Sequence, residues 1–493
     1  MTLTVAPVQP ATRSRLLLTV VGLAGFVTTL DNTVVTVALP SIQRDLHTRL
    51  SALEWVATGY ILTFAGLMIA GGRLADVYGR RKVLLIGLTV FTGASLSAGL
   101  ATSIEPLVAA RLTQGVGAAL ILPATLAVLA GRPDRSLGVA IWMASGAGAL
   151  ALGPVVGGYL SQHAHWSWVF LINVPIGVAV IALATVAIPE TCPEPPAGQH
   201  AEPPAGQHAE TLAGQRAGPR TEERAGHRSE PRAGQRAGRR GQVDVPGLLA
   251  SVVFLASGTF ALIHGGEYGW GSPPILIAVG GCVGGGLLFL VVERGARAPM
   301  VELGLFAGRS FSGGVLAQVL WGLGVNGVFF YTALFLQGVL GFTPTASGMA
   351  FVPLALLVVV VTPLVPVVER RLGSGRTVAC GLVLVAAGMV GAAFLEAGDG
   401  WGRLVPAVCA IGVGSALTMP LGSAVLAAVP ESRAGVAGGI FSVSREISGL
   451  FGIAAIGVIV HEAGSFSQGY ALGLLVAAAL VLLGALIAML TLP

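Results

Sequence analysis

Long apolar runs recur along nearly the whole of this 493-residue chain, with little between them. Each is about 20 residues long, the length that a helix needs to cross roughly 30 Å of hydrocarbon. Since backbone hydrogen bonds must be satisfied inside a bilayer, runs of this kind predict membrane-spanning helices. We predict fourteen of them, at residues 16–39, 51–72, 82–101, 105–130, 136–160, 167–188, 245–264, 273–293, 311–337, 343–368, 374–395, 402–428, 434–460 and 468–492.

The composition indicates that the whole chain, and not only a single anchor segment, is embedded in the membrane. Charged residues make up 10% of the sequence and hydrophobic residues 54%, whereas a soluble domain carries about 25% charged residues. The sequence therefore predicts an all-α integral membrane protein.

The bases in the short connections predict the orientation. Most of them fall in alternate loops, with Arg44, Arg49 and Arg403 as the few bases on the opposite side. Loops rich in arginine and lysine face the cytoplasm. The bases on this side are Arg13, Arg15, Arg80, Arg81, Lys82, Arg132, Arg135, Arg294, Arg297, Arg309, Arg370, Arg371, Arg376 and Arg433. The pattern predicts both termini in the cytoplasm and accounts for the net charge of +5 without a nucleic-acid partner. The preference for arginine over lysine favours a bacterial source, and hence the bacterial cytoplasmic membrane.

Internal repetition divides the chain. The string GVGAALILP at 115–123 returns as GVGSALTMP at 412–420, and PDRSLGVA at 133–140 returns as PESRAGVA at 430–437. Both pairs have the same offset, which indicates a duplication relating the first six helices to the last six. The predicted parts are a six-helix bundle, a linker, two inserted helices and a second six-helix bundle, at residues 1–189, 190–243, 244–308 and 309–493.

The predicted linker is rich in proline, glycine and glutamine, and PPAGQHAE occurs in it twice in tandem. Such a segment cannot bury a core, so we predict a disordered cytoplasmic connection. Its arginines leave a lipid-binding tail open as an alternative to a neutral spacer. We favour the spacer because glutamates dilute the bases.

The sequence excludes one source of energy. A phosphate-binding loop needs a lysine that follows a glycine, but Lys82, the only lysine in the chain, follows Arg81. An ion gradient or a separate subunit must therefore drive any transport. Motifs of zinc proteases, redox dithiols and serine hydrolases are also missing from the sequence, so we predict no enzyme activity, metal or cofactor.

Charges inside the predicted helices are the functional candidates, because each costs several kcal/mol unless it is paired or faces a wet cavity. Asp31 lies about nine residues, or roughly 13 Å, from the outer end of its helix, and Arg111 about six residues, or roughly 9 Å. These depths allow the two residues to share one site. A functional role for these two charges and a purely structural ion pair are both open. The duplicated positions carry no charge, so any function of these charges is concentrated in the first half.

Three further polar residues, Gln114, Asn326 and Arg445, are candidates for a central cavity. Asn326 lies beside the position that the duplication pairs with Asp31. Arg445 lies about eleven residues into its helix, and the next residue, Glu446, should point about 100° away from it. A substrate contact, an interdomain latch and a structural pairing all remain open for Arg445.

The segment GRLADVYGRRKVL at 72–84 concentrates charge between two apolar runs. At a membrane surface its acid and bases are expected to pair with each other and with helix ends. The residues of this candidate conformational gate are Gly72, Asp76, Gly79, Arg80 and Arg81.

The predicted fifth helix contains GAGALALGPVVGG. Small residues let helix backbones approach closely, and an internal proline removes a backbone hydrogen bond and bends the helix. The residues concerned are Gly153, Pro154, Gly157 and Gly158.

These strings resemble motifs of the major facilitator superfamily. G-x-L-A-D-x-x-G-R-R/K is similar to the signature between its second and third helices, although Val77 stands where the family usually has a base. LVAARLTQGVGAA resembles the helix-four motif R-x-x-q-G, which the family associates with proton transfer and which matches at Arg111 and Gln114. The helix-five string resembles G-x-x-x-G-P-x-x-G-G, a motif associated with exporters, with Ala149 in place of the first glycine.

The six plus two plus six plan and the string L-D-x-T-x-V-x-V-A-L-P around Asp31 resemble the fourteen-helix drug/proton antiporter family. The resemblance implies two six-helix bundles with two inserted helices, working as a monomer. It implies a proton-coupled secondary active exporter of amphipathic drugs or antibiotics, with Asp31 and Arg111 in proton coupling. The partners are then a small-molecule substrate, protons and the lipid bilayer. A dedicated exporter of one endogenous metabolite and a non-transporting membrane sensor or scaffold remain as alternatives.

Overall fold

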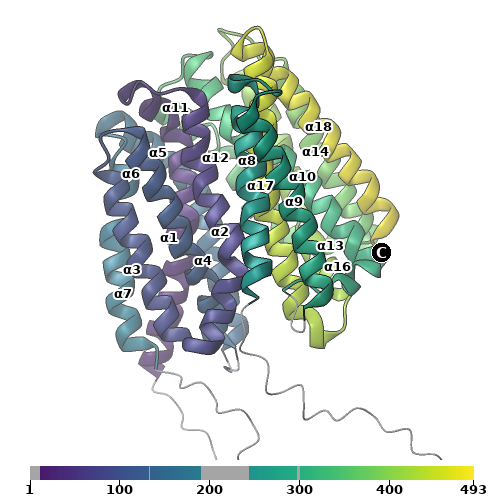
Figure 1. Ribbon diagram of the computed structural model, residues 1–493. Helices are drawn as coiled ribbons and strands as arrows, with labels where there is room; N and C mark the ends of the chain where they lie inside the picture. Colours follow the sequence, from purple (N-terminus) through teal and green to yellow (C-terminus); the bar gives the residue numbers. More distant parts are fainter. Residues whose placement is uncertain (1–10, 131, 133, 190–243, 297–299) are drawn as a thin grey trace, which may run out of the picture.

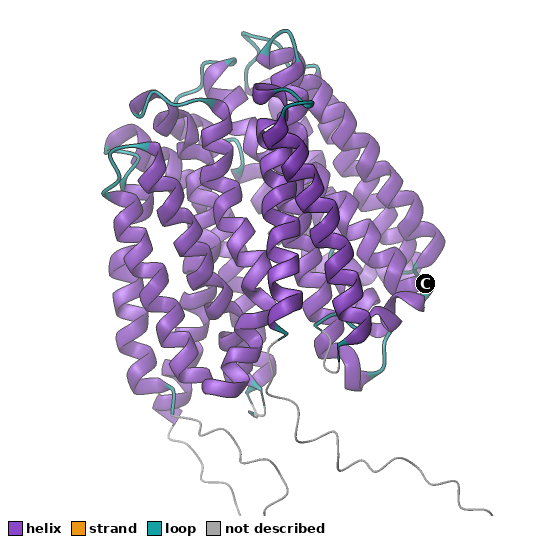
Figure 2. Cartoon of the chain, in the orientation of Figure 1, coloured by secondary structure: helices purple, strands orange, loops and turns teal. Residues whose placement is uncertain are grey.

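The computed structural model describes residues 11–130, 132, 134–189, 244–296 and 300–493, and every regular element in this part of the chain is helical (Figures 1 and 2). Fourteen helical stretches in it are long and apolar enough to cross a membrane, which confirms the predicted spans. The first seven helices are α1 (Ala11–Asp45), α2 (Leu50–Tyr78), α3 (Arg80–Gly99), α4 (Ile104–Leu129), α5 (Arg135–His163), α6 (Trp168–Leu171) and α7 (Asn173–Ala187). The rest are α8 (Val245–Tyr268), α9 (Pro273–Gly295), α10 (Arg309–Gly338), α11 (Pro344–Met349), α12 (Val352–Val361), α13 (Val365–Leu372), α14 (Ser374–Ala393), α15 (Trp401–Leu417), α16 (Pro420–Ala427), α17 (Ala434–Glu462) and α18 (Phe466–Thr491). The predicted linker at 190–243 lies outside the described residues.

Several helices run past the predicted apolar limits. The run predicted at 51–72 continues as α2 to Tyr78, and the run predicted at 16–39 continues as α1 to Asp45. Hydropathy marks only the part of a helix that meets lipid, whereas the backbone hydrogen bonds continue into the polar headgroup layer. Prolines explain the breaks inside single spans, since Pro420 begins α16 and Pro363 lies in the 3₁₀ turn between α12 and α13.

The two halves use the same set of helix contacts. In the first half α1 packs on α5 and α7, α2 on α4, and α3 on α4 and α7. In the second half α10 packs on α17 and α18, α12 on α15, and α14 on α15 and α18. This repetition agrees with the sequence duplication. The inserted helices α8 and α9 pack on each other, and α8 also contacts α2 and α17, so the pair stands between the halves in Figure 1.

Glycine makes the tightest connection in each half. Gly79 alone joins α2 to α3 with φ 97°, and Gly373 joins α13 to α14 with φ 81°. A residue with a side chain rarely adopts such a φ. We name the Gly79 side of the molecule the α2/α3 end, and the opposite side, which holds residues 46–49, the α1/α2 end.

Hydrogen bonds between the two halves gather toward the α1/α2 end. The Gln337 side chain donates to the Val37 carbonyl at 2.9 Å, and the Thr345 backbone N–H donates to the Gln162 side chain at 3.1 Å. Here α11 packs on α5, and α17 packs on α2. The structure is therefore a state in which the α1/α2 end is held closed.

Candidate functional site

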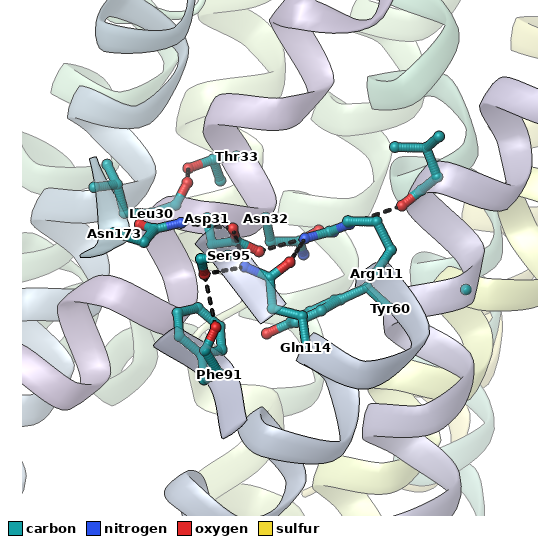
Figure 3. A network of polar contacts seen from close by, with 12 residues as sticks. Leu30, Asp31, Asn32, Thr33, Tyr60, Phe91, Ser95, Arg111, Gln114 and Asn173 are labelled. Atoms are coloured by element: carbon teal, nitrogen blue, oxygen red, sulfur yellow. Dashed lines mark hydrogen bonds and ion pairs between the residues drawn. The ribbon is translucent and has the colours of Figure 1, made fainter. Parts of the chain in front are cut away.

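Asp31, on α1, is fully buried at the centre of a polar network inside the first half (Figure 3). Its Oδ2 accepts a hydrogen bond from Arg111 Nη1 at 2.5 Å. Its Oδ1 accepts from Gln114 Nε2 at 2.7 Å and from Asn173 Nδ2 at 2.8 Å. One carboxylate thus ties α1 to α4 and α7 through three donors.

Arg111 has a second set of partners that fix its guanidinium. Nε donates to the Val56 carbonyl of α2 at 2.9 Å, and Nη1 also donates to Gln114 Oε1 at 2.7 Å. The guanidinium carbon lies 4.4 Å from the centroid of the Tyr60 ring, within cation–π range. The arginine is therefore held in place by contacts other than its ion pair with Asp31.

The network is not saturated. Arg111 Nη2 and Asn173 Oδ1 are buried without a hydrogen-bond partner in the described part of the chain. Buried polar groups normally find partners, so these atoms offer places for a water or a rearranged side chain.

A separate cavity of about 500 Å³ lies between the halves. Asn32, Thr33 and Thr36 of α1 line it on one side, so the residues that follow Asp31 face the cavity while Asp31 faces the polar network. Six aromatic residues also line it: Trp321, Phe329, Phe330, Phe351, Phe441 and Tyr470. A mostly apolar wall with a few polar groups is typical of a small-molecule site.

Two of the three predicted cavity residues line this space. Asn326 and Arg445 do so, but Gln114 does not, because its side chain is fully buried against Asp31 and Ser95. The expected separation of Arg445 from Glu446 was also wrong. Nε and Nη2 of Arg445 both donate to Glu446 Oε1, at 3.1 and 2.8 Å. The two long side chains bend toward each other although their Cβ atoms diverge.

The residues of the candidate gate lie at the helix ends on both sides of Gly79 and not in a longer loop. Arg81 Nη2 donates to the Thr185 carbonyl in the last turn of α7 at 2.8 Å, which is the expected pairing with a helix end. Asp76 is exposed on α2 and has no hydrogen bond or ion pair to a described residue, so its expected pairing is not formed in this state. Arg80 begins α3, and a methyl group added at Gly72 would lie 3.5 Å from Pro123 Cβ, an ordinary contact.

Another charged group joins helices at the α2/α3 end of the first half. Asp134, just before α5, accepts hydrogen bonds from Arg132 Nε at 2.9 Å and from the hydroxyl of Ser14 on α1. The hydrogen bond from Arg132, supported by that from Ser14, holds the pKa of Asp134 below its ordinary value. This carboxylate therefore stays ionised and joins the beginnings of α1 and α5.

The small residues of α5 lie where the two halves meet. A methyl group at Gly157 would lie 2.5 Å from the Val34 carbonyl oxygen of α1. One at Gly158 would lie 2.3 Å from the Pro344 carbonyl oxygen of α11, and one at Gly348 of α11 would lie 2.1 Å from the Pro154 carbonyl oxygen. One at Gly153 would lie 1.9 Å from the Thr33 hydroxyl oxygen. The motif thus packs α5 on α1 within one half and on α11 of the other half.

Adding a methyl group at this contact should open the α1/α2 end. In Gly158→Ala, backbone atoms would have to move, at a cost of about 1–3 kcal/mol, so we expect the closed-to-open ratio to fall about tenfold. The ratio is measured from the distance between labels on Thr102 and Ala397, two exposed positions of opposite halves at this end. Gly148→Ala is the matched control, because nothing lies within 4 Å of a methyl group there. Equal distance distributions in the two variants would contradict the close contact.

Comparison with known proteins decides the family. The family model described as Major Facilitator Superfamily matches residues 21–453. The chain belongs to the major facilitator superfamily. The resemblance seen in its motifs is thereby confirmed, and the chain is a multi-pass membrane protein of a transporter family.

Among the superfamily members similar to this chain are resistance and export proteins. The methylenomycin A resistance protein of Streptomyces coelicolor is 32% identical, over 94% of this chain and 89% of its own length. The cephamycin export protein CmcT of Amycolatopsis lactamdurans is 33% identical, over 90% and 84%. The multidrug resistance protein Stp of Mycobacterium tuberculosis is 30% identical, over 89% and 74%. Among solved structures, the POT family transporter PepTSo has a TM-score of 0.66 at 13% identity, over 98% of both chains, a likeness that shows the superfamily fold.

Sequence reasoning missed three members of the network. Asn173, Ser95 and Tyr60 are polar but uncharged, and no motif or duplicated position in the sequence marks them, as they do Gln114 and Asn326. Asn173 carried a usable signal, because it interrupts the apolar run predicted at 167–188 and lies at the break between α6 and α7.

The surroundings of Asp31 do not suit a metal ion. Its carboxylate is contacted by N–H donors, namely those of a guanidinium and two amides, and N–H groups cannot ligate a cation. In the described part of the chain, no group of three or more histidine, cysteine, aspartate and glutamate side chains is arranged to hold a metal ion.

Proposed function

We propose that this protein exports amphipathic, antibiotic-like small molecules across a bacterial cytoplasmic membrane in exchange for protons. The observation that carries the proposal is that one helix serves both tasks. On α1, Asp31 belongs to the buried network, while Asn32 and Thr33 form part of the cavity wall. The relatives named for resistance to or export of methylenomycin A and cephamycin support the substrate class. The proposal involves a monomer and requires neither a cofactor nor chemical conversion of the substrate.

The positive-inside rule supports an orientation with the α2/α3 end, and both termini, in the cytoplasm. Arg80, Arg81, Lys82 and Arg135 all lie in the first turns of helices that begin at this end. In this orientation the contacts of the α1/α2 end close the outer side, and the cavity belongs to an inward-facing state.

The cavity fits the apolar body of an amphipathic compound. Aromatic and aliphatic side chains provide contact area, and a few polar groups, such as Gln318, Asn326 and Arg445, are available for orientation. Arg445 keeps 53% of its side chain exposed although it is paired with Glu446.

Coupling follows from the charge of Asp31. While it is ionised, Asp31 holds α1 against α4 and α7 through Arg111, Gln114 and Asn173. A proton on the carboxylate removes the charge that attracts Arg111 and leaves one fewer acceptor site, which loosens α1. Because the next residues of α1 form the cavity wall, proton binding and substrate binding then bias the same two-state movement.

The gate acts, in this proposal, in the opposite state. Asp76 is exposed while the α1/α2 end is closed, so it is available for pairing when the α2/α3 end closes. The exporter motif acts in the present state, in which Gly158 and Pro154 contact α11 across the closed outer side.

A drug panel in an efflux-deficient bacterial host tests the function. Expression of the protein should lower the accumulation of several amphipathic antibiotics or dyes, and a protonophore should restore it. Protection against one compound only would favour the dedicated exporter. Unchanged accumulation for the whole panel, with the protein present in the membrane, would favour the sensor or scaffold.

A further inference from the structure

Glu54, in the second turn of α2, is fully buried where the first half meets the second. The hydroxyl of Tyr331 on α10 donates to its Oε1 at 2.6 Å. His461 Nε2, at the end of α17, lies 3.3 Å from the same oxygen. Glu54 Oε2 has no hydrogen-bond partner in the described part of the chain. The proposed transport cycle does not use this carboxyl.

The cluster is packed tightly and joins the two halves at the closed α1/α2 end. A methyl group at Gly457 on α17 would lie 2.6 Å from the Tyr331 hydroxyl and 2.9 Å from Glu54 Oε1. Glu54 comes from the first half, whereas Tyr331, Gly457 and His461 come from the second. Separation of the halves at this end would therefore pull the cluster apart and admit water.

The arginines close to this part of α2 already have partners. Arg49, just before α2, pairs with Glu267 of α8, and Arg111, which donates to the Val56 carbonyl, pairs with Asp31. The titratable and charged groups on the elements packed against this part of α2 are Tyr331 of α10, His461, Glu462 and the paired Arg445 and Glu446 of α17, His264 and Glu267 of α8, Arg49, Asp31 of α1, and Arg111 and Glu105 of α4. His461 is thus the basic group in contact with Glu54.

A count of protons follows from this arrangement. In the closed state, Glu54 is neutral with a proton of its own, or it is ionised beside a charged His461. Each arrangement holds one proton, so the pair titrates as a unit. An ionised Glu54 beside a neutral imidazole would be a buried charge without a countercharge, which is the costly case. In water near neutral pH, a separated carboxyl is ionised and an imidazole is largely neutral, so the opened pair holds none.

We propose that Glu54 and His461 form a proton-binding site that takes up one proton when the α1/α2 end closes and releases it when that end opens. The sign follows from linkage. The closed state binds one proton more than the open state, so lowering the pH on this side favours closure, by up to about tenfold in the closed-to-open ratio per pH unit. The site therefore stabilises the closed state of the α1/α2 end when the water at this end is acidic.

The test measures the closed-to-open ratio directly, without substrate. The labels are placed on Thr102→Cys and Ala397→Cys after the four native cysteines are replaced, and the background carries Asp31→Asn to remove the other proton site. We expect the closed population to rise on acidification between about pH 8 and 6.5, by up to tenfold per unit, and to level off at lower pH, where the separated imidazole takes up a proton of its own. In Glu54→Gln the change should be under about twofold per unit, because an amide holds no proton. A flat ratio with Glu54 present would overturn the proposal, as would an unchanged slope in Glu54→Gln.

Two further variants make the result specific. Glu105→Gln changes an exposed glutamate at the same end and should keep the full slope. Tyr331→Phe keeps the carboxyl but removes a donor that favours its ionised form, so the midpoint should move to higher pH. If Glu54→Gln does not fold, Tyr331→Phe provides the test instead. An unchanged midpoint in the pH dependence of the closed-to-open ratio would contradict the proposed site. Drug export is not measured here, so a negative result leaves the proposed function intact.

Discussion

Replacing Asp31 by asparagine is expected to abolish uphill efflux while the protein remains folded. The amide keeps the size of the side chain but cannot bind and release a proton, so the step that exchanges protons for substrate is lost. Arg111 loses its countercharge but keeps the Val56 carbonyl, Gln114 and the Tyr60 ring. Proteoliposomes with an imposed pH gradient should accumulate no substrate above background, whereas downhill movement should persist.

The matched control is Asp45→Asn on the same helix. Asp45 is half-exposed at the end of α1, where it accepts from Trp166 Nε1 at 2.6 Å and lies 3.3 Å from His165 Nε2. The same chemical change there removes a surface charge outside the buried network, so uphill efflux should stay within about twofold of the parent. Full uphill efflux by the Asp31 variant would remove Asp31 from the coupling mechanism.

The helices of this fold could be predicted from sequence because the bilayer imposes a length and a composition on each of them. Their ends could not, because a helix continues through the headgroup layer without an apolar signal. This difference matters at the gate. The run predicted at 51–72 places Asp76 in a loop, whereas the structure places it on the last turns of α2.

The Asp31–Arg111 pair was predictable for a physical reason. Burying two unpaired charges at similar depth in one helix bundle costs several kcal/mol each, so an arrangement in which they pair is strongly favoured. The neutral partners Asn173 and Ser95 give no such signal, because single amides and hydroxyls are tolerated on any helix that packs against another. Their contribution appears only when the structure brings α3, α4 and α7 around α1.

Glu54 shows where sequence reasoning of this kind ends. It lies near the beginning of an apolar run, where a charge is ordinary, and its partner Tyr331 is 277 residues away. Only the packing of α2 against α10 and α17 shows that this carboxyl is buried. The sequence pattern of a single helix does not predict whether the interface between the two halves is closed or open.

Removal of Arg111 is expected to destabilise the protein more than removal of Asp31. In Arg111→Gln the buried carboxylate keeps the amide donors Gln114 and Asn173 but has no countercharge. Breaking a buried pair from one side typically costs about 3–5 kcal/mol. The arginine left behind in Asp31→Asn is better accommodated, since it retains hydrogen bonds and an aromatic contact.

The double variant Asp31→Asn/Arg111→Gln separates a charge effect from a packing effect. It leaves two neutral side chains in place of two charges, and a buried pair replaced on both sides is often close to neutral for stability. We therefore expect its free energy of unfolding to exceed that of Arg111→Gln, with a coupling between the two sites of at least about 2 kcal/mol. Unfolding is followed by titration with a denaturing detergent, with the parent and both single variants completing the cycle. Additive losses would show that the two charges do not stabilise each other, and would leave Asp31 without the partner through which its protonation is proposed to move α1.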